Sequence, residues 1–379
     1  MSQIVVFGGG FVGVVAATEL RKKLGKEHKV IVVDKKQDHL FTPSLLWLIV
    51  DERKPEKIQR SLNVLNKKGI EYLNGDVQKI NPVKKTVITS TGELIYDYLI
   101  ISLGAEIVRD IMPGYRDGIN FYCLKGAEVL RDELKRFEGG KVAVVIASTP
   151  FKCPAAPYEA AFLIDAYLAK RGIKDKTDIA IYTPETLPMP VAGPVLGSAV
   201  KEMLERRGIS FNPGRKLISM EGKELSFEGG ERVRADLIAW VPPHRAPAVV
   251  KDSGLTNESG WIPVDGRTMK TQFDGVYAIG DITANKLPSG MMLPKAGVFA
   301  HGQAEVVANN IAVEINKDGE LREFDGQGSC FLELGHGYAG FASGNFYADP
   351  KPVVILKNPG KMWHWGKVAF EKWWLWKWF

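Results

Sequence analysis

The sequence predicts an α/β fold built from two Rossmann-like (three-layer ββα) domains, followed by a C-terminal region of different composition. Residues 4–23 show an apolar strand, a glycine-rich turn and a helix in direct succession. Residues 141–171 repeat the order of strand, turn and helix. The length of 379 residues exceeds one ordinary core and suits two such domains with an extension. The predicted domains cover residues 1–105 together with 256–315, then residues 106–255, and finally the C-terminal region 316–379.

A glycine fingerprint opens the first domain. Gly8, Gly10 and Gly13 give the pattern G-x-G-x-x-G between the strand and the helix, and a second apolar strand ends in Asp34. The glycines permit a tight turn and let backbone N–H groups approach a pyrophosphate at the positive end of the helix, while the carboxylate accepts from a ribose hydroxyl. The alternative is a plain glycine-rich turn, but the order of strand, turn, helix and acid favours a dinucleotide.

Two later segments, residues 96–105 and 275–281, resemble the secondary FAD motifs of the pyridine nucleotide-disulfide oxidoreductase superfamily. The resemblance implies that the cofactor is FAD and that Asp281 binds its ribityl chain or pyrophosphate. In that superfamily the helix that follows aims its N-terminus at the flavin, and Lys295 stands where it would assist the charge of the reduced ring; a lysine at a helix start is the alternative. The expected cofactor-binding residues are Gly8, Gly10, Phe11, Gly13, Asp34, Lys35, Val77, Gly104, Asp281, Lys295 and Gly297.

The turn of the second domain lacks the glycines that a nicotinamide dinucleotide requires. Residues 147–154 are Ala-Ser-Thr-Pro-Phe-Lys-Cys-Pro, whose side chains and prolines would block the approach of a pyrophosphate. The next strand is followed by Thr183 and Pro184, so Glu185, the acid that would bind a ribose, is displaced by two positions. Both departures argue against an NADH dehydrogenase.

Three cysteines are too few for the disulfide framework of a secreted protein and are better explained by chemistry. Cys153 occupies the second turn, where the N-terminus of a helix is expected to lower the thiol pKa. Cys330 follows it by 177 residues (330 − 153), and Cys123 precedes it by 30 (153 − 123). For each of them the alternative is a small buried hydrophobic residue. The six histidines show no metal-ligand spacing, so no metal site is expected.

Over essentially its whole length the sequence resembles the sulfide:quinone oxidoreductases and the related flavin subunit of flavocytochrome c sulfide dehydrogenase. Residues 153–159 are similar to the block around the first redox cysteine of these enzymes, Cys330 matches the second, and residues 41–44 and 240–245 look like further family blocks. The flavocytochrome subunit has a flavin-linking cysteine in the loop near residues 39–44, and this chain has none there. Cys123 instead falls where the quinone reductases place a third cysteine, which favours a quinone over a cytochrome as acceptor.

The resemblance implies oxidation of sulfide to polysulfide or sulfur, with electrons passing through FAD to a quinone. Cys153 and Cys330 would flank the flavin and pass sulfane sulfur between them, and Cys123 would handle the sulfur product or attach the flavin. Attack of hydrosulfide on a Cys153–Cys330 disulfide would open the cycle. Glu159, six residues beyond Cys153, would shuttle protons if burial raised its pKa; the alternative is an acid favoured there by the helix dipole.

Residues 351–379 contain six lysines, one acid and six of the nine tryptophans of the chain. Spacings of 3, 4, 4 and 3 place one set of side chains on a single helix face, with His364, Lys367 and Glu371 opposite; the set is Met362, Trp365, Ala369, Trp373 and Trp376. A tryptophan-rich face with lysines suits the headgroup boundary of a membrane, so we expect peripheral, monotopic association and a short path for a quinone. The alternative is docking of the helix on its own domain or on a neighbouring subunit. The candidates for contact with the quinone ring are Phe341, Phe346 and Tyr347.

Composition narrows the location and the partners. No stretch approaches the roughly 20 uninterrupted apolar residues that a membrane-spanning helix needs. No export signal follows Met1, so we expect the cytoplasmic side of the membrane. The net charge of +6, from 50 basic and 44 acidic residues, is a mild bias that does not indicate a nucleic acid partner. A homo-oligomer is left open.

Three other functions are left open by the residues themselves. A type II NADH dehydrogenase would share FAD, quinone and the membrane-binding tail, but it would need the second glycine fingerprint. A cytochrome-linked sulfide dehydrogenase would differ in its acceptor and would be exported. A non-catalytic FAD protein that binds a partner through its aromatic tail would show no reduction by sulfide.

Overall fold

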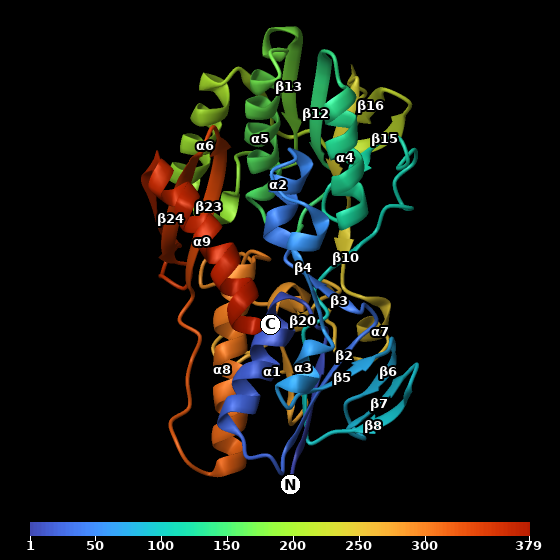
Figure 1. Cartoon of the computed structure of the whole chain (residues 1–379), viewed down its shortest axis with the longest axis vertical. Helices are drawn as coiled ribbons and strands as arrows, with labels where there is room; N and C mark the ends of the chain where they lie inside the picture. Colours follow the sequence, from blue (N-terminus) through green and yellow to red (C-terminus); the bar gives the residue numbers. More distant parts are fainter.

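The computed structural model describes all 379 residues and contains two parallel sheets, one above the other in Figure 1. The first sheet has the order β21 (Val276–Ala278), β9 (Tyr98–Ile101), β1 (Gln3–Phe7), β2 (Lys29–Asp34) and β5 (Glu71–Asn74), and all its neighbours are parallel. The second has the order β11 (Ile119–Asn120), β18 (Leu237–Val241), β12 (Gly140–Ile146), β13 (Thr177–Tyr182) and β14 (Ile209–Asn212), again all parallel. Four neighbouring strands therefore follow the same order in both sheets, β9-β1-β2-β5 and β18-β12-β13-β14, as the repeated sequence pattern predicts. The edge strands differ, because β21 follows the other strands of its sheet in the chain and β11 precedes them.

Each sheet is covered by helices on one face and by a small antiparallel sheet on the other. Alternate residues of β1 divide between these layers: Ile4 and Val6 share a core with α1 (Phe11–Lys23) and α8 (Gly297–Asn316), whereas Val5 and Phe7 face the other way. There they pack against the sheet of β6 (Val77–Asn81), β7 (Thr86–Thr89) and β8 (Gly92–Ile95).

In the second sheet β12 divides in the same way between two layers. Its helix layer is made by α4 (Leu124–Arg136), α5 (Ala156–Lys170) and α6 (Pro194–Arg206). Its opposite layer is the antiparallel sheet of β15 (Leu217–Glu221), β16 (Glu224–Phe227) and β17 (Arg232–Arg234). The predicted α/β class with two three-layer ββα units is confirmed.

The C-terminal region adds a third antiparallel sheet and a long helix. The sheet consists of β23 (Gln327–Gly335), β24 (Tyr338–Asn345) and β25 (Val353–Gly360), and it packs on α5 through β23. The helix α9 (Lys361–Trp378) follows directly, and in Figure 1 it runs from this sheet toward α1, so that the C-terminus lies beside the first domain. Helix α9 therefore touches both halves of the molecule.

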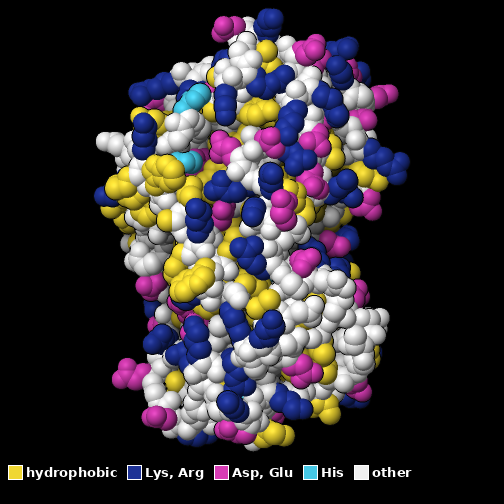
Figure 2. All heavy atoms as spheres, in the orientation of Figure 1, with side chains coloured by type: hydrophobic (Ala, Val, Ile, Leu, Met, Phe, Trp, Pro, Cys, Tyr) yellow, Lys and Arg dark blue, Asp and Glu magenta, His cyan; other side chains and the backbone are white.

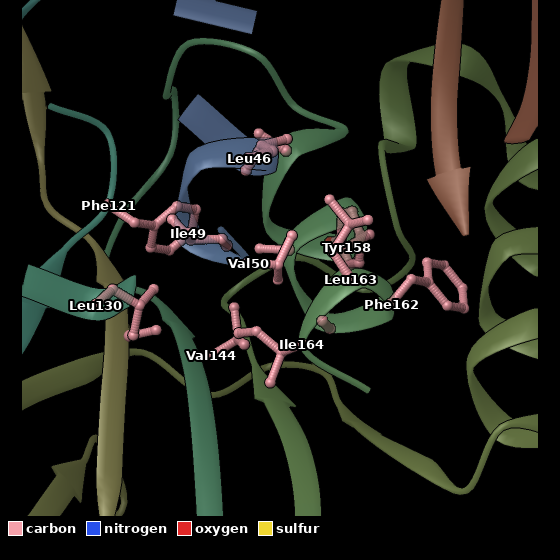
Figure 3. Packing of buried hydrophobic residues seen from close by; sticks show 14 of the residues in the cluster. Leu46, Ile49, Val50, Phe121, Leu130, Val144, Tyr158, Phe162, Leu163 and Ile164 are labelled. Carbon is pink, nitrogen blue, oxygen red and sulfur yellow. The ribbon is translucent and has the colours of Figure 1, made fainter. Parts of the chain in front are cut away.

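A short helix from the first part of the chain also packs into the second core. Figure 3 shows Leu46, Ile49 and Val50, from α2 (Leu45–Ile49) and its C-terminal end, lying among buried residues of the second unit such as Val144 and Tyr158. The remaining short elements are α3 (Val64–Lys67), α7 (Ala248–Lys251), β3 (Asp38–Leu40), β4 (Gln59–Ser61), β10 (Glu106–Ile107), β19 (His244–Arg245), β20 (Ile262–Pro263) and β22 (Thr283–Ala284). None of the helices is both long and apolar enough to cross a bilayer.

Candidate functional site: a dinucleotide crevice beside a cysteine pair

The first glycine loop has the geometry that a pyrophosphate requires. Gly8 has a φ of +93°, which favours glycine. A Cβ on Gly13 would lie 1.8 Å from the carbonyl oxygen of Gly8, so no larger residue fits where α1 approaches the turn. A Cβ on Gly10 would meet no atom within 4 Å, so this backbone is open to a ligand at the start of α1. The loop therefore fits the diphosphate of FAD at the positive end of a helix.

Asp34 supports the same loop from the end of β2. Its Oδ2 accepts a hydrogen bond from the Gly9 N–H at 2.7 Å, and its Oδ1 accepts from the Lys36 N–H at 2.8 Å. The Lys35 side chain is largely exposed and its Nζ lies 3.9 Å from Asp76. The Val77 side chain is buried in the core between the sheets, so only its backbone is available to a cofactor. Ribose binding by Asp34 thus stays a prediction, while its role in holding the turn is visible.

The later FAD motifs converge on the same crevice. Gly104 has a φ of +67° and open space beside its Cα. Gly280 donates its N–H to Gln303 of α8 at 2.8 Å, which places Asp281 in the turn after β21. Burial raises the pKa of the Asp281 carboxyl, although nearby Lys152 and Lys295 oppose the shift.

Lys295 is held more tightly than a lysine at a free helix start. Its Nζ donates to the carbonyl of Asp281 at 2.7 Å and to that of Thr283 at 3.1 Å, and it lies 3.4 Å from the ring centroid of Trp261. Burial lowers the pKa of Lys295 to about 8, and Asp281 counteracts this. Lys295 precedes Gly297, the first residue of α8, so it lies at the positive end of that helix.

The turn between β12 and α5 differs from the glycine loop at its centre. Cys153 has a φ of +51°, a left-handed conformation that is unfavourable for a residue with a Cβ. Its N–H donates to the carbonyl of Lys295 at 2.6 Å, and the Tyr122 hydroxyl donates to the Cys153 carbonyl at 3.2 Å. The backbone of Cys153 is thus held against the segment that leads into α8.

Cys330 on β23 lies close enough to Cys153 to raise its pKa, although 177 residues separate the two in sequence (330 − 153). Solvent reaches part of each residue. The thiol groups are nevertheless surrounded mostly by protein atoms, and this burial is the main cause of their raised pKa values. All three cysteines are free thiols in this structure.

The expected lowering of the Cys153 pKa is wrong. Burial raises it strongly, and the nearby Cys330 and Glu159 raise it further. The reason is that desolvation and neighbouring acidic groups outweigh the dipole of α5, which begins only at Ala156. Burial, followed by Glu159, raises the pKa of Cys330 to about 11. The pair is therefore electrostatically unsuited to hold two thiolates at once.

Cys123 lies at the N-cap of α4, where its Sγ is 3.6 Å from the Asn120 carbonyl oxygen.

Lys152 is a residue that the sequence reasoning missed. Burial lowers its pKa, while Asp281, Cys123 and Cys153 oppose the shift. The Lys152 ammonium is therefore close enough to interact with Asp281 of the FAD motif and with the thiols of Cys123 and Cys153. Its position directly before Cys153 was the only available signal.

Glu159 forms a buried ion pair with Lys367 of α9. The two residues are 208 positions apart in the sequence (367 − 159). Burial raises the pKa of Glu159 to about 7, although the ammonium of Lys367 opposes this. A second pair lies beside it, with His364 Nδ1 2.9 Å from Glu333 of β23. Lys367 and Glu333 were not among the predicted site residues, although Lys367 had been placed on the polar face of the helix.

A cavity of about 750 Å³ occupies the place where a second nucleotide would bind. It is lined by the second turn, by the end of β13 and by apolar residues of the third sheet, and Cys330 lies in its wall. Its charged lining residues are Glu185 and Lys295. Glu185 accepts a hydrogen bond from the Tyr158 hydroxyl, and burial raises its pKa to about 7. The cavity offers an apolar surface rather than a nucleotide site.

The three proposed quinone contacts are not gathered at one place. Phe346 lines the cavity and packs edge-on against Phe299. Phe341 stacks on Trp363 of α9, with ring centroids 4.5 Å apart. The Tyr347 hydroxyl donates to the carbonyl of Gly266. The structure therefore does not bring these rings together around one ligand.

The two faces of α9 have opposite surroundings. The predicted face is outward, with Trp365 65% and Trp376 78% exposed, and Val353 and Ile355 of β25 extend it. Figure 2 shows hydrophobic side chains gathered over β24 and α9, with lysines between them. Lys367 and Glu371, on the opposite face, are buried and paired with Glu159 and Arg53. The helix thus exposes apolar groups on its outward face, whereas its inward face buries these two charged residues together with Trp374, Leu375 and Trp378.

Comparison with known proteins agrees with this geometry. The family model described as pyridine nucleotide-disulphide oxidoreductase matches residues 2–304. The sulfide-quinone reductase of Aquifex aeolicus is 28% identical, over 99% of this chain and 90% of the relative. The mitochondrial sulfide:quinone oxidoreductase of Mus musculus is 26% identical, over 92% and 79%. The solved structure of the Aquifex aeolicus sulfide:quinone oxidoreductase superposes with a TM-score of 0.90 at 26% identity, covering 100% of this chain and 91% of that one.

Proposed function

The chain belongs to the pyridine nucleotide-disulphide oxidoreductase family, and we propose that it oxidises sulfide to polysulfide or sulfur and passes the electrons through FAD to a quinone. The relatives named for sulfide and quinone, which align over most of the chain, bear out this prediction. The observation that carries it is that Cys330 lines the same cavity as Pro154 and Ala155, next to Cys153, whose N–H is bonded to the segment that leads into α8. The turn there lacks the glycines that a nicotinamide dinucleotide requires.

Sulfur chemistry is assigned to this pair. In its oxidised form the pair is a disulfide, and hydrosulfide attacks one sulfur, giving a persulfide on one cysteine and a thiolate on the other. We assign the persulfide to Cys153 and the thiolate to Cys330. FAD, when bound, accepts the two electrons that sulfide loses and delivers them to the quinone. Cys123, which like Cys153 influences the pKa of Lys152, is assigned to the sulfur product or to the flavin.

Proton movement is assigned to Glu159. Its pKa of about 7 lets it take up and release a proton near neutral pH, and the partner Lys367 is held in place by the same ion pair. Because Glu159 influences the pKa of both Cys153 and Cys330, its charge also decides how readily each thiol ionises.

Access of the quinone is assigned to α9 and β25. The exposed tryptophans and the neighbouring lysines suit the headgroup region of a membrane, so the protein would bind there peripherally and present α9 to a lipid-soluble acceptor. Among the predicted quinone contacts, Phe341 lies nearest to this surface because it stacks on Trp363. Phe346 lies in the cavity that contains Cys330, on the sulfur side of the site.

An anaerobic titration of the flavin-loaded protein with sulfide tests the proposal. Sulfide should bleach the flavin absorbance, decylubiquinone should restore it, and NADH should leave it unchanged. Cys153→Ser should keep the flavin but lose its reduction by sulfide, since the alcohol cannot form a persulfide. Bleaching by NADH with none by sulfide, or a fully active Cys153→Ser protein, would contradict the proposal.

A further inference from the structure

The FAD loop is held by residues that lie outside the glycine fingerprint. The Gly9 peptide is fixed from both sides: its N–H donates to Asp34 at 2.7 Å, and its carbonyl oxygen lies 3.0 Å from Nδ1 of His39. Since a carbonyl oxygen only accepts, His39 must donate its proton from Nδ1. This tautomer agrees with the other ring nitrogen, Nε2, which is buried without a partner.

His39 is itself enclosed by the C-terminal helix. It is 2% exposed, and burial lowers its pKa to about 4, so it is neutral at physiological pH. Its ring stacks on Trp374, with centroids 4.9 Å apart and planes at 28°, and it lies at the same distance from Phe379. The orientation of the hydrogen bond to Gly9 is therefore set by aromatic residues from the end of the chain.

The same tryptophan contacts the loop directly. Trp374 stacks on Phe11, with centroids 4.5 Å apart and planes at 11°, and Phe11 is the residue after Gly10 in the fingerprint. On its other side Phe11 faces Gly297, where an added Cβ would lie 3.4 Å from the ring. Trp374 is fully buried, whereas Trp376, two positions later, is 78% exposed. The indole N–H of Trp374 has no partner, so its contribution comes from the ring.

We propose that α9 supports the cofactor site. Trp374 of α9 and His39 of β3 are positioning residues that hold the pyrophosphate loop in the conformation that binds FAD. Trp374 acts through Phe11 and through His39, and His39 acts through the carbonyl of Gly9. The inference rests on FAD as the cofactor but not on the chemistry of sulfide. It goes beyond the proposed function because it gives the inward face of the helix a role separate from the outward, membrane-facing one.

The test is the affinity of the flavin-free protein for FAD, measured by quenching of flavin fluorescence without sulfide or quinone. Trp374→Ala should weaken FAD binding by at least about tenfold, corresponding to about 1.4 kcal/mol. Trp374→Phe should restore most of the affinity because it keeps the stacking. Trp376→Ala is the matched control and should bind FAD like the wild type, since its side chain touches solvent.

Two histidine variants make the test independent of α9. His39→Leu should weaken FAD binding severalfold, whereas His39→Asn, whose amide can still donate to the Gly9 carbonyl, should bind more tightly than His39→Leu. The melting temperature of each flavin-free variant separates positioning from folding, because a positioning role lowers FAD affinity even where that temperature is kept. Equal FAD affinity for Trp374→Ala and Trp376→Ala, or for His39→Leu and the wild type, overturns the proposal. Loss of sulfide-dependent bleaching with intact FAD binding would count against the proposed function alone.

Discussion

Each of the two parallel sheets has a strand-to-helix turn at the same topological position. The first turn consists of glycines, and the second carries the side chain of Cys153. In the first, Gly8 and Gly13 allow the backbone to turn tightly, and Gly10 leaves it open to a diphosphate. In the second, Cys153 stands in a left-handed conformation that glycine would adopt more easily. The comparison teaches that one scaffold can leave bare backbone open to a cofactor and, in its second copy, place a cysteine side chain at the turn instead.

The largest effect is expected from breaking the first turn. Gly13→Ala puts a Cβ against the Gly8 carbonyl, and the forced backbone shift should destabilise the protein by about 5 kcal/mol. Urea denaturation of the flavin-free protein measures this. Gly10→Ala is the matched control, because its Cβ meets no atom within 4 Å: it should fold normally and lose only FAD affinity. A Gly13→Ala protein as stable as Gly10→Ala would refute the account of the turn.

The second turn is expected to depend on α9 through Glu159. Glu159→Gln leaves the buried ammonium of Lys367 without its nearest partner, which should cost about 4 kcal/mol. The double variant Glu159→Gln with Lys367→Met removes both charges and should regain most of that stability. Thermal unfolding of the two variants decides the matter; a double variant less stable than the single one would argue against a simple ion pair.

Acid should destabilise the first turn through His39. Burial depresses the pKa of His39 from 6.5 to about 4, with Arg60 and Lys36 adding to the shift. The unfolded chain therefore binds more protons between these values, so stability is complete above pH 6.5 and falls by up to about 3 kcal/mol as the pH drops to 4. Denaturation midpoints across this range should be flatter for His39→Asn. An equally steep decline in that variant would assign the effect to other groups.

The smallest expected effect concerns the left-handed backbone of Cys153, and it tests the difference between the two turns most directly. Cys153→Gly relieves the left-handed strain and should be about 1 kcal/mol more stable than Cys153→Ala, which keeps it. Both variants should lack reduction of the flavin by sulfide. Such a result would indicate that cysteine is present at this position for its chemistry, at some cost in stability. Equal stabilities would show instead that the surrounding hydrogen bonds alone determine this backbone.

Much of this architecture could be predicted because it depends on local patterns. The glycine fingerprint, the apolar strands and the spacing of Trp365, Trp373 and Trp376 are regular in sequence, and each element formed where its pattern lies. The ionisation of Cys153 was predicted in the wrong direction. The dipole of a helix can be inferred from sequence, but the burial and the acidic neighbours that outweigh it come from other segments.

The sequence by itself determined the layered α/β fold, the first glycine loop and the absence of a second one, because these follow from residue types and short-range periodicity. The choice of FAD and of Cys153 and Cys330 as reactive residues came instead from the resemblance to a known family, and the reactivity of these cysteines stays a prediction. Only the tertiary structure decided which other distant groups meet: Lys367 with Glu159, and Trp374 with the glycine loop. Such pairings depend on how separate cores pack together. Neighbouring tryptophans of one helix, Trp374 and Trp376, therefore lie in buried and exposed positions without any difference in their own chemistry.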